Sequence, residues 1–182
     1  TGLSARIATL LCPSDPVSLS PGCSYRAGCG ALPYEMEGNP RGGGGVFPGL
    51  TAMRPNEIRD GLSQTIGVGE GVMGSDSEGF DPRRDFWFSG ISQIRQPGSS
   101  DEMMDVCARL AAVPPTFWAR SGENWSVGGY SDTTYNHVAQ PNWATPDCSA
   151  DLPFGAPGDV SGGAISARSN HPGGVHSLFM DG

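Results

Sequence analysis

The residues best suited to chemistry lie in the C-terminal stretch NHPGGVHSLFMDG, which contains His171, His176 and Asp181. Two imidazoles and a carboxylate could together bind a metal ion or transfer protons. However, the Pro-Gly-Gly of 172–174 predicts a turn, and the apolar residues of 175–180 predict a strand. A strand rises about 3.3 Å per residue, so we expect His171 and Asp181 to lie far apart and His176 to project alone. We therefore predict that this trio shapes a β-hairpin and performs no chemistry.

Other parts of the chain offer partial constellations for hydrolysis. Nucleophiles and bases to consider are Ser63, Ser89, Cys29, His137 and His171. Neither a G-x-S-x-G elbow nor an H-E-x-x-H motif is present. The acidic surroundings also do not favour an activated thiolate. We expect no enzyme activity, and a hydrolase stays a third hypothesis.

The loop GSDSEGFDP carries the alternating acidic residues Asp76, Glu78 and Asp81. Oxygen ligands in a flexible loop suit Ca²⁺, although the spacing does not match an EF-hand and acidic turns are common without an ion. Calcium is the one cofactor that the sequence suggests. With exposed Trp and Tyr side chains, such a loop would fit a surface module that binds calcium or carbohydrate, which is the second functional hypothesis.

The chain contains five cysteines, at Cys12, Cys23, Cys29, Cys107 and Cys148. No C-x2-C pair is present, which argues against a structural zinc site. Disulfides in an exported protein are the better interpretation. We expect one bridge within the group Cys12, Cys23 and Cys29, and a second between Cys107 and Cys148, although spacing alone cannot fix the connectivity.

Composition favours one loop-rich domain spanning 1–182. Glycine (28 residues) and proline (16 residues) make up about a quarter of the 182 residues, while aromatic residues are spread along the whole chain. The net charge is −8 and all basic residues are Arg. An acidic chain without basic clusters is not expected to bind nucleic acid or an anionic membrane surface.

Local patterns predict mostly β structure with one main helix. The helix is expected at 99–115, where Met103, Val106, Cys107 and Leu110 form an apolar stripe. A single helical turn is expected near 56–61, ended by Asp60-Gly61. Strands are expected at 7–11, 24–30, 66–68, 84–90 and 175–180, with irregular loops from 116 to about 163. The predicted class is α+β.

Five landmarks occur in one order along the chain: RIATLLCPSDP, SYRAGCG, EIRDGLSQTIGVGE, YNHVAQPN and ARSNHPGGVHSLFMDG. The last has an H-x9-D-G spacing. Together they resemble a family of prepilin-like secreted proteins that is abundant in planctomycetes. The signature residues in this sequence are His171, Asp181 and Gly182, with Asp60, Gly61 and Glu70 in the central motif.

The resemblance implies a pilin-like or pseudopilin-like globular head, exported to the periplasm or cell surface. Members begin with a type IV prepilin leader and a hydrophobic helix, through which they assemble into filaments and contact the membrane. That helix and a strand after Gly182 are absent from this chain, so we expect a fragment of a longer protein. The expected role is a non-catalytic structural subunit of a filament, secretion apparatus or envelope complex, with itself or other subunits as partners.

Overall fold

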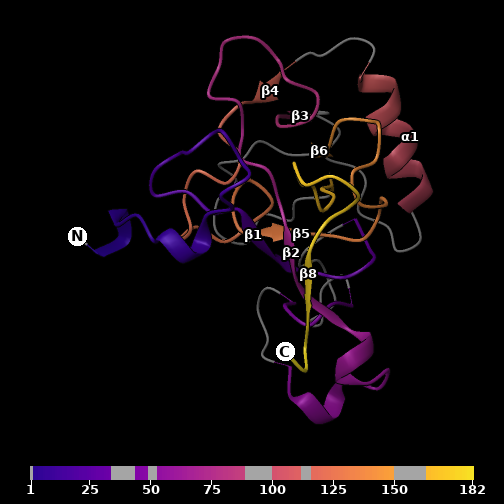
Figure 1. Cartoon of the computed structure of the whole chain (residues 1–182). Coiled ribbons are helices and arrows are strands. Elements are labelled where there is room, and N and C mark those ends of the chain that lie inside the picture. The colour runs from indigo at the N-terminus through magenta and orange to yellow at the C-terminus, as the bar shows by residue number, and fades with distance from the viewer. Residues whose placement is uncertain (1, 34–43, 49–52, 89–99, 112–115, 150–162) are drawn as a thin grey trace.

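The computed structural model describes residues 2–33, 44–48, 53–88, 100–111, 116–149 and 163–182. In these ranges the chain forms two four-stranded sheets and one α-helix, so the predicted mostly-β α+β class is confirmed (Figure 1). The strands are β1 Tyr25–Gly28, β2 Ile66–Glu70, β3 Phe86–Phe88, β4 Phe117–Trp118, β5 Thr134–Tyr135, β6 Cys148–Ser149, β7 Gly163–Ala164 and β8 Ser177–Phe179. The helix is α1 Ser100–Leu110, and four 3-10 turns are η1 Gly2–Ser4, η2 Ala8–Leu10, η3 Pro55–Glu57 and η4 Leu62–Gln64. Within the described residues, no helix is long and apolar enough to cross a membrane.

The first sheet has the order β5-β1-β2-β8. Its centre, β2, is antiparallel to β1 and to β8, while β5 adds in parallel to β1. The glycines of β2 permit close packing, because a Cβ at Gly69 would lie 2.8 Å from the Tyr135 ring. Glycine in a strand is typical of a place where another element comes close.

The second sheet has the order β4-β3-β6-β7 and supports the main core. The helix α1 lies alongside this sheet in Figure 1. Its stripe residues Met103, Val106 and Cys107 are buried in one cluster with Trp87 and Trp143. The predicted helix is therefore present, and its stripe residues Met103, Val106 and Cys107 form core, while the side chain of Leu110 lies outside the described part of the structure.

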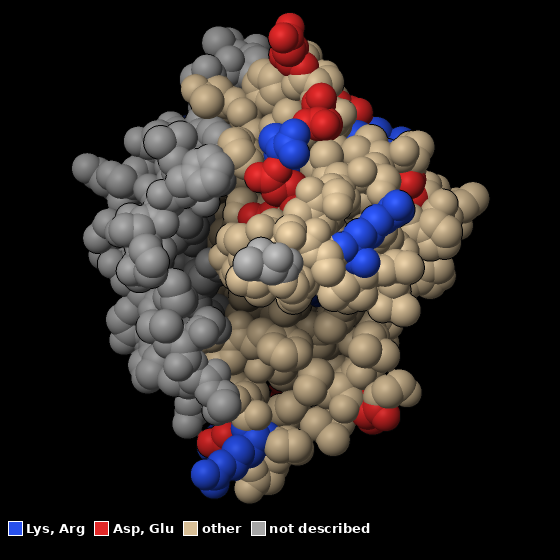
Figure 2. All heavy atoms as spheres, turned by 90° about the vertical axis from the view of Figure 1, so that its left-hand side faces the viewer, with Lys and Arg blue, Asp and Glu red and all other residues tan. Residues whose placement is uncertain are grey.

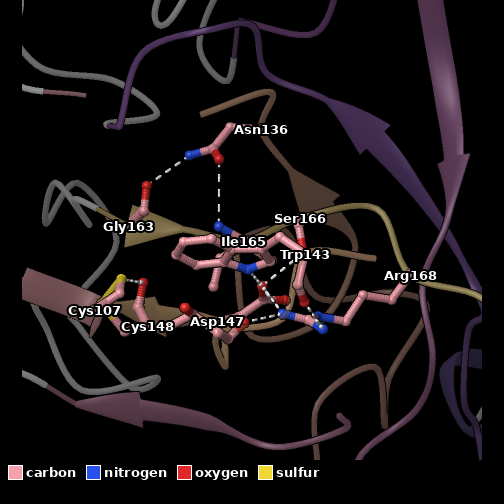
Figure 3. Close-up of a disulfide and its surroundings, with 10 residues drawn as sticks. Cys107, Asn136, Trp143, Asp147, Cys148, Gly163, Ile165, Ser166 and Arg168 are labelled. Carbon is pink, nitrogen blue, oxygen red and sulfur yellow. Dashed lines mark hydrogen bonds and ion pairs between the residues drawn. A yellow bond between two sulfur atoms is a disulfide. The ribbon is translucent and has the colours of Figure 1, made fainter. Parts of the chain in front are cut away.

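The disulfide between Cys107 and Cys148 ties α1 to β6, and it is the pair expected from the sequence. Next to the disulfide lies a cluster of buried polar side chains (Figure 3). The Asp147 carboxylate accepts hydrogen bonds from Trp143 Nε1 at 3.1 Å, Ser166 Oγ at 2.7 Å and Arg168 Nη2 at 2.8 Å. Such side-chain bonds satisfy polar groups in a chain with little secondary structure.

Charged surface groups are mixed by sign. On the face shown in Figure 2, arginines lie among acidic side chains and form no separate patch. For example, Arg120 forms ion pairs with both Asp76 and Glu123, and Arg84 with Asp15 at 2.7 Å. Much of the charge is thus locally compensated.

Two predictions about the N-terminal part are wrong. Ala8–Leu10 form the 3-10 turn η2 between the extended residues Ile7 and Leu11, and not a buried strand, because Leu10 N and Leu11 N donate to the carbonyls of Ile7 and Ala8. The expected bridge within the N-terminal cysteine group is also not formed, and all three carry free thiols. Their sulfurs point to different partners: Cys12 to Glu70 and His171, Cys23 to Tyr25 O, and Cys29 to Ala27 O.

Candidate functional site

The side chain of Glu70, the last residue of β2, is the meeting point of several distant segments. It is only 3% exposed. Cys12 reaches it from the loop after η2, while His171 and His176 reach it from the segment that leads into β8. Backbone hydrogen bonds fix this arrangement, since Glu70 N donates to His176 O and Arg168 N donates to Glu70 O.

Three of these side chains bring ligand atoms together. Glu70 Oε1 lies 3.2 Å from His171 Nε2 and 3.8 Å from Cys12 Sγ. Cys12 Sγ in turn lies 3.4 Å from His171 Nε2. Among the described residues, these three side chains form a group of potential metal ligands whose donor atoms all lie within 4.8 Å of one another.

His176 contacts the same carboxylate from the solvent side. Its Nδ1 is 3.3 Å from Glu70 Oε1, and its backbone N donates to Glu70 Oε2 at 2.8 Å. The rings of His171 and His176 pack edge to face with centroids 4.7 Å apart. The His176 side chain is 76% exposed, whereas that of His171 is 27% exposed.

The geometry does not match a nucleophile–histidine–acid relay. In such a relay, the nucleophile and the acid contact opposite nitrogens of the imidazole. Here Cys12 and Glu70 both approach Nε2 of His171, while Nδ1 lies 3.3 Å from Ser14 Oγ. Convergence of three different donor atoms on one small volume is typical of a metal ligand set.

Electrostatics favour an ionised carboxylate at the centre. Burial acts to raise the pKa of Glu70, but hydrogen bonds from His176 and Ser169 and the charge of His171 outweigh it, so the pKa is lowered. In the described part of the chain, the ion pairs of Glu70 are to the two histidines. The site therefore holds a buried negative charge.

The prediction that His176 projects alone and stays apart from His171 is wrong. It assumed an extended chain, but Gly173 and Gly174 adopt positive φ angles of 95° and 157° and fold the chain back. Asp181 does not join the histidines, and lies exposed in the turn after β8. The sequence offered Cys12 only as a disulfide candidate and Glu70 only as a family-signature residue, because nothing local links positions that are 58 and more residues apart.

The residues that the sequence resemblance suggested as a signature lie at the two ends of the antiparallel β2–β8 pair. Glu70 and His171 meet at one end. Gly61, with a φ of 90°, lies before η4 at the other end, where Met180 N donates to carbonyls of the η4 region. Asp60 and the final residues 181–182 are exposed there. The signature thus marks the anchoring of β8 at both of its ends.

The acidic loop does not assemble the expected calcium ligands. Asp76 forms an ion pair with Arg120, Asp81 accepts a hydrogen bond from Arg83 N, and Glu78 is exposed. The loop is closed by the buried Asp85, which accepts hydrogen bonds from Ser75 N and Oγ and from Asp81 N. This role of Asp85 was not predicted from the sequence.

The remaining candidates are spread over the fold. Ser63 is exposed in η4, and Ser89 lies outside the described residues. His137 Nε2 lies 3.3 Å from the Tyr135 hydroxyl. A carbohydrate surface would need exposed Trp and Tyr side chains, but Tyr130 and Trp143 are buried. These positions do not form a common site.

The comparison with family models identifies the chain. The model described as "Protein of unknown function (DUF1559)" matches residues 1–182, and the chain belongs to this family. No curated protein matches, and no solved structure matches. The family description assigns no activity, so function is argued from the structure.

Proposed function

We propose that the chain is the globular head of a non-catalytic structural subunit that is exported and assembles into a pilus-like or pseudopilus-like filament or another envelope complex. The resemblance in sequence to prepilin-like proteins suggested this role. The buried Cys107–Cys148 disulfide supports an oxidising compartment such as the periplasm or cell surface. Membership of a family without an assigned activity is compatible with it.

The observation that carries the proposal is the edge strand β8. Among the described residues, β8 pairs with β2 alone and ends the order β5-β1-β2-β8. All three of its residues are exposed, with Leu178 at 54% and Phe179 at 40%. Exposed apolar edge strands are usually protected in monomers, because they pair with other chains. The neighbour that we propose is a second copy of this chain, which in the whole protein would compete for this edge with the strand expected after Gly182.

The test is the association state of the purified chain and of two matched variants. Leu178→Lys places a charge on the exposed face of β8, and Leu3→Lys places one on η1, where Leu3 is 63% exposed. Sedimentation velocity over a concentration series should show association of the wild type. We expect Leu178→Lys to weaken it at least tenfold and Leu3→Lys to leave it unchanged.

Two results would reject self-assembly through β8: a wild type that stays monomeric at every concentration, or equal effects of both lysines. Circular dichroism would confirm that each variant is folded. Export is tested separately, by alkylating free thiols in fractionated cells that make the whole protein. Cys107 and Cys148 should resist alkylation and occur in the exported fraction, and reduced cysteines in the cytoplasm would contradict export.

A further inference from the structure

We propose that Cys12, Glu70 and His171 bind one transition-metal ion of the zinc class. The donors are a thiol sulfur, a carboxylate oxygen and an imidazole nitrogen, all in hydrogen-bonding or contact distance of one another. This inference concerns a different part of the molecule from the outer edge of β8 and does not depend on the proposed function.

The spacing of the three donor atoms matches a tetrahedral metal centre. With metal bonds of about 2.3 Å to sulfur, 2.05 Å to nitrogen and 2.0 Å to oxygen, tetrahedral angles separate sulfur from nitrogen or oxygen by about 3.5 Å, and nitrogen from oxygen by about 3.3 Å. The structure has 3.4 Å between Cys12 Sγ and His171 Nε2 and 3.8 Å between Cys12 Sγ and Glu70 Oε1. It has 3.2 Å between Nε2 and Oε1. Only small side-chain adjustments are needed to place an ion among them.

The type of donor selects the class of ion. Calcium and magnesium prefer shells of oxygen atoms, whereas a thiolate with an imidazole and a carboxylate suits zinc and similar divalent ions. The neighbouring groups also resemble the supports of metal ligands. Ser14 Oγ lies 3.3 Å from Nδ1 of His171, which holds its Nε2 toward the site, and the His176 backbone N donates to Glu70.

A small cavity adjoins two of the three proposed ligands, Cys12 and Glu70. A cavity of about 10 Å³, enough for about one water molecule, is lined by Cys12, Glu70 and Asn170 among others. The amide nitrogen Nδ2 of Asn170 is buried and has no hydrogen-bond partner in the described part of the chain. It can donate a hydrogen bond to a water or anion on the ion. Three protein ligands with one open position are the arrangement of a site that exchanges its fourth ligand.

Metal binding displaces a proton from the site. The Cys12 thiol loses its proton to solvent as the sulfur bonds to the ion, while Glu70 as the carboxylate and His171 in the form without a proton on Nε2 bind with no further proton change. The expected products are one bound ion per chain and a proton released to the buffer. No oxidant or reductant takes part.

The experiment uses the full chain after chelator treatment, and Zn²⁺ and Co²⁺ as probes. Isothermal titration should give one Zn²⁺ per chain, and Co²⁺ should produce thiolate-to-metal charge-transfer absorption. Cys12→Ser and His171→Gln should each weaken Zn²⁺ binding at least tenfold and remove that absorption. Matched controls are Cys23→Ser, which alters another buried free thiol, and His137→Gln, which alters a histidine that contacts Tyr135 and not the ligand triangle.

A second measurement keeps the test valid if a variant does not fold. In the wild type, Zn²⁺ should slow alkylation of Cys12 at least tenfold and leave the rates at Cys23 and Cys29 unchanged, as mapped by mass spectrometry. Absence of Zn²⁺ binding would overturn the proposal. Binding that is lost in the Cys23 or His137 controls, or that protects no thiol, would overturn it as well.

Discussion

Reducing the Cys107–Cys148 disulfide should greatly destabilise the fold. The bond closes a loop with a sequence separation of 41 residues. Loop-closure entropy for that length corresponds to about 4 kcal/mol, compared with a typical unfolding free energy of roughly 5–15 kcal/mol. For a chain of this size, such a loss lowers the melting temperature by about 10 °C. Both cysteines are 0% exposed, so the native packing around them should persist until the chain unfolds.

Thermal denaturation with and without a thiol reductant measures this effect, and alkylation with mass spectrometry confirms that the bond was cleaved. The double variant Cys107→Ala/Cys148→Ala is the control. It should melt at a lower temperature than the oxidised wild type and should not respond to reductant. If the cleaved wild type kept its melting temperature, the stabilising role of the bond would be refuted and the argument for export weakened.

Three further perturbations test other parts of the structure. Asp147→Asn should cost about 3–5 kcal/mol in urea denaturation, because it leaves a buried arginine unpaired, whereas Asp76→Asn in an exposed ion pair should cost at most about 1 kcal/mol. Burial raises the pKa of Tyr135 to about 12, so the neutral phenol stabilises the fold fully below pH 10. This stabilisation, on the order of 2 kcal/mol, is lost as the pH rises toward 12. The loss should be absent in Tyr135→Phe when the unfolding free energies of the two proteins are compared across this pH range. Gly74→Ala should destabilise by about 1–3 kcal/mol, because its Cβ would lie 2.2 Å from a backbone oxygen, while Gly128→Ala has open space and should be nearly neutral by the same assay.

Elements defined by local patterns could be predicted from the sequence. The helix α1 has a 3.6-residue apolar period and acidic residues in its first turn, and both signals are contained within its own residues. The aromatic strand β3 and the strand β2 were found for the same reason. The apolar run 7–11 misled the analysis, since a five-residue run has the same composition in a strand and in a 3-10 turn.

The cluster at Glu70 could not be predicted, because its contacts join residues 58, 106 and 159 positions apart. Periodicity shows which face of an element is buried and does not show which distant residue meets it. The one local sign was the sequence of β2 itself, IGVGE, in which a carboxylate closes a strand of small and apolar residues. A buried carboxylate needs donors or a cation, so such a residue indicates partners elsewhere in the chain.

The two proposals meet at the β2–β8 pair and can be separated there. Glu70 and the histidines fix the start of β8, and the backbone bonds of Met180 to the η4 region fix its end. A strand anchored at both ends keeps its outer edge straight and its apolar side chains exposed, which a docking edge requires. An ion at Cys12, Glu70 and His171 would tighten the first anchor, so Zn²⁺ should slow hydrogen exchange of the β8 amides. Because Leu178 lies on the exposed side of β8 and not in the ligand triangle, Leu178→Lys should weaken association at least tenfold and leave metal binding intact. His171→Gln should have the opposite effect. It should abolish metal binding, and it should weaken association only to the extent that β8 becomes mobile.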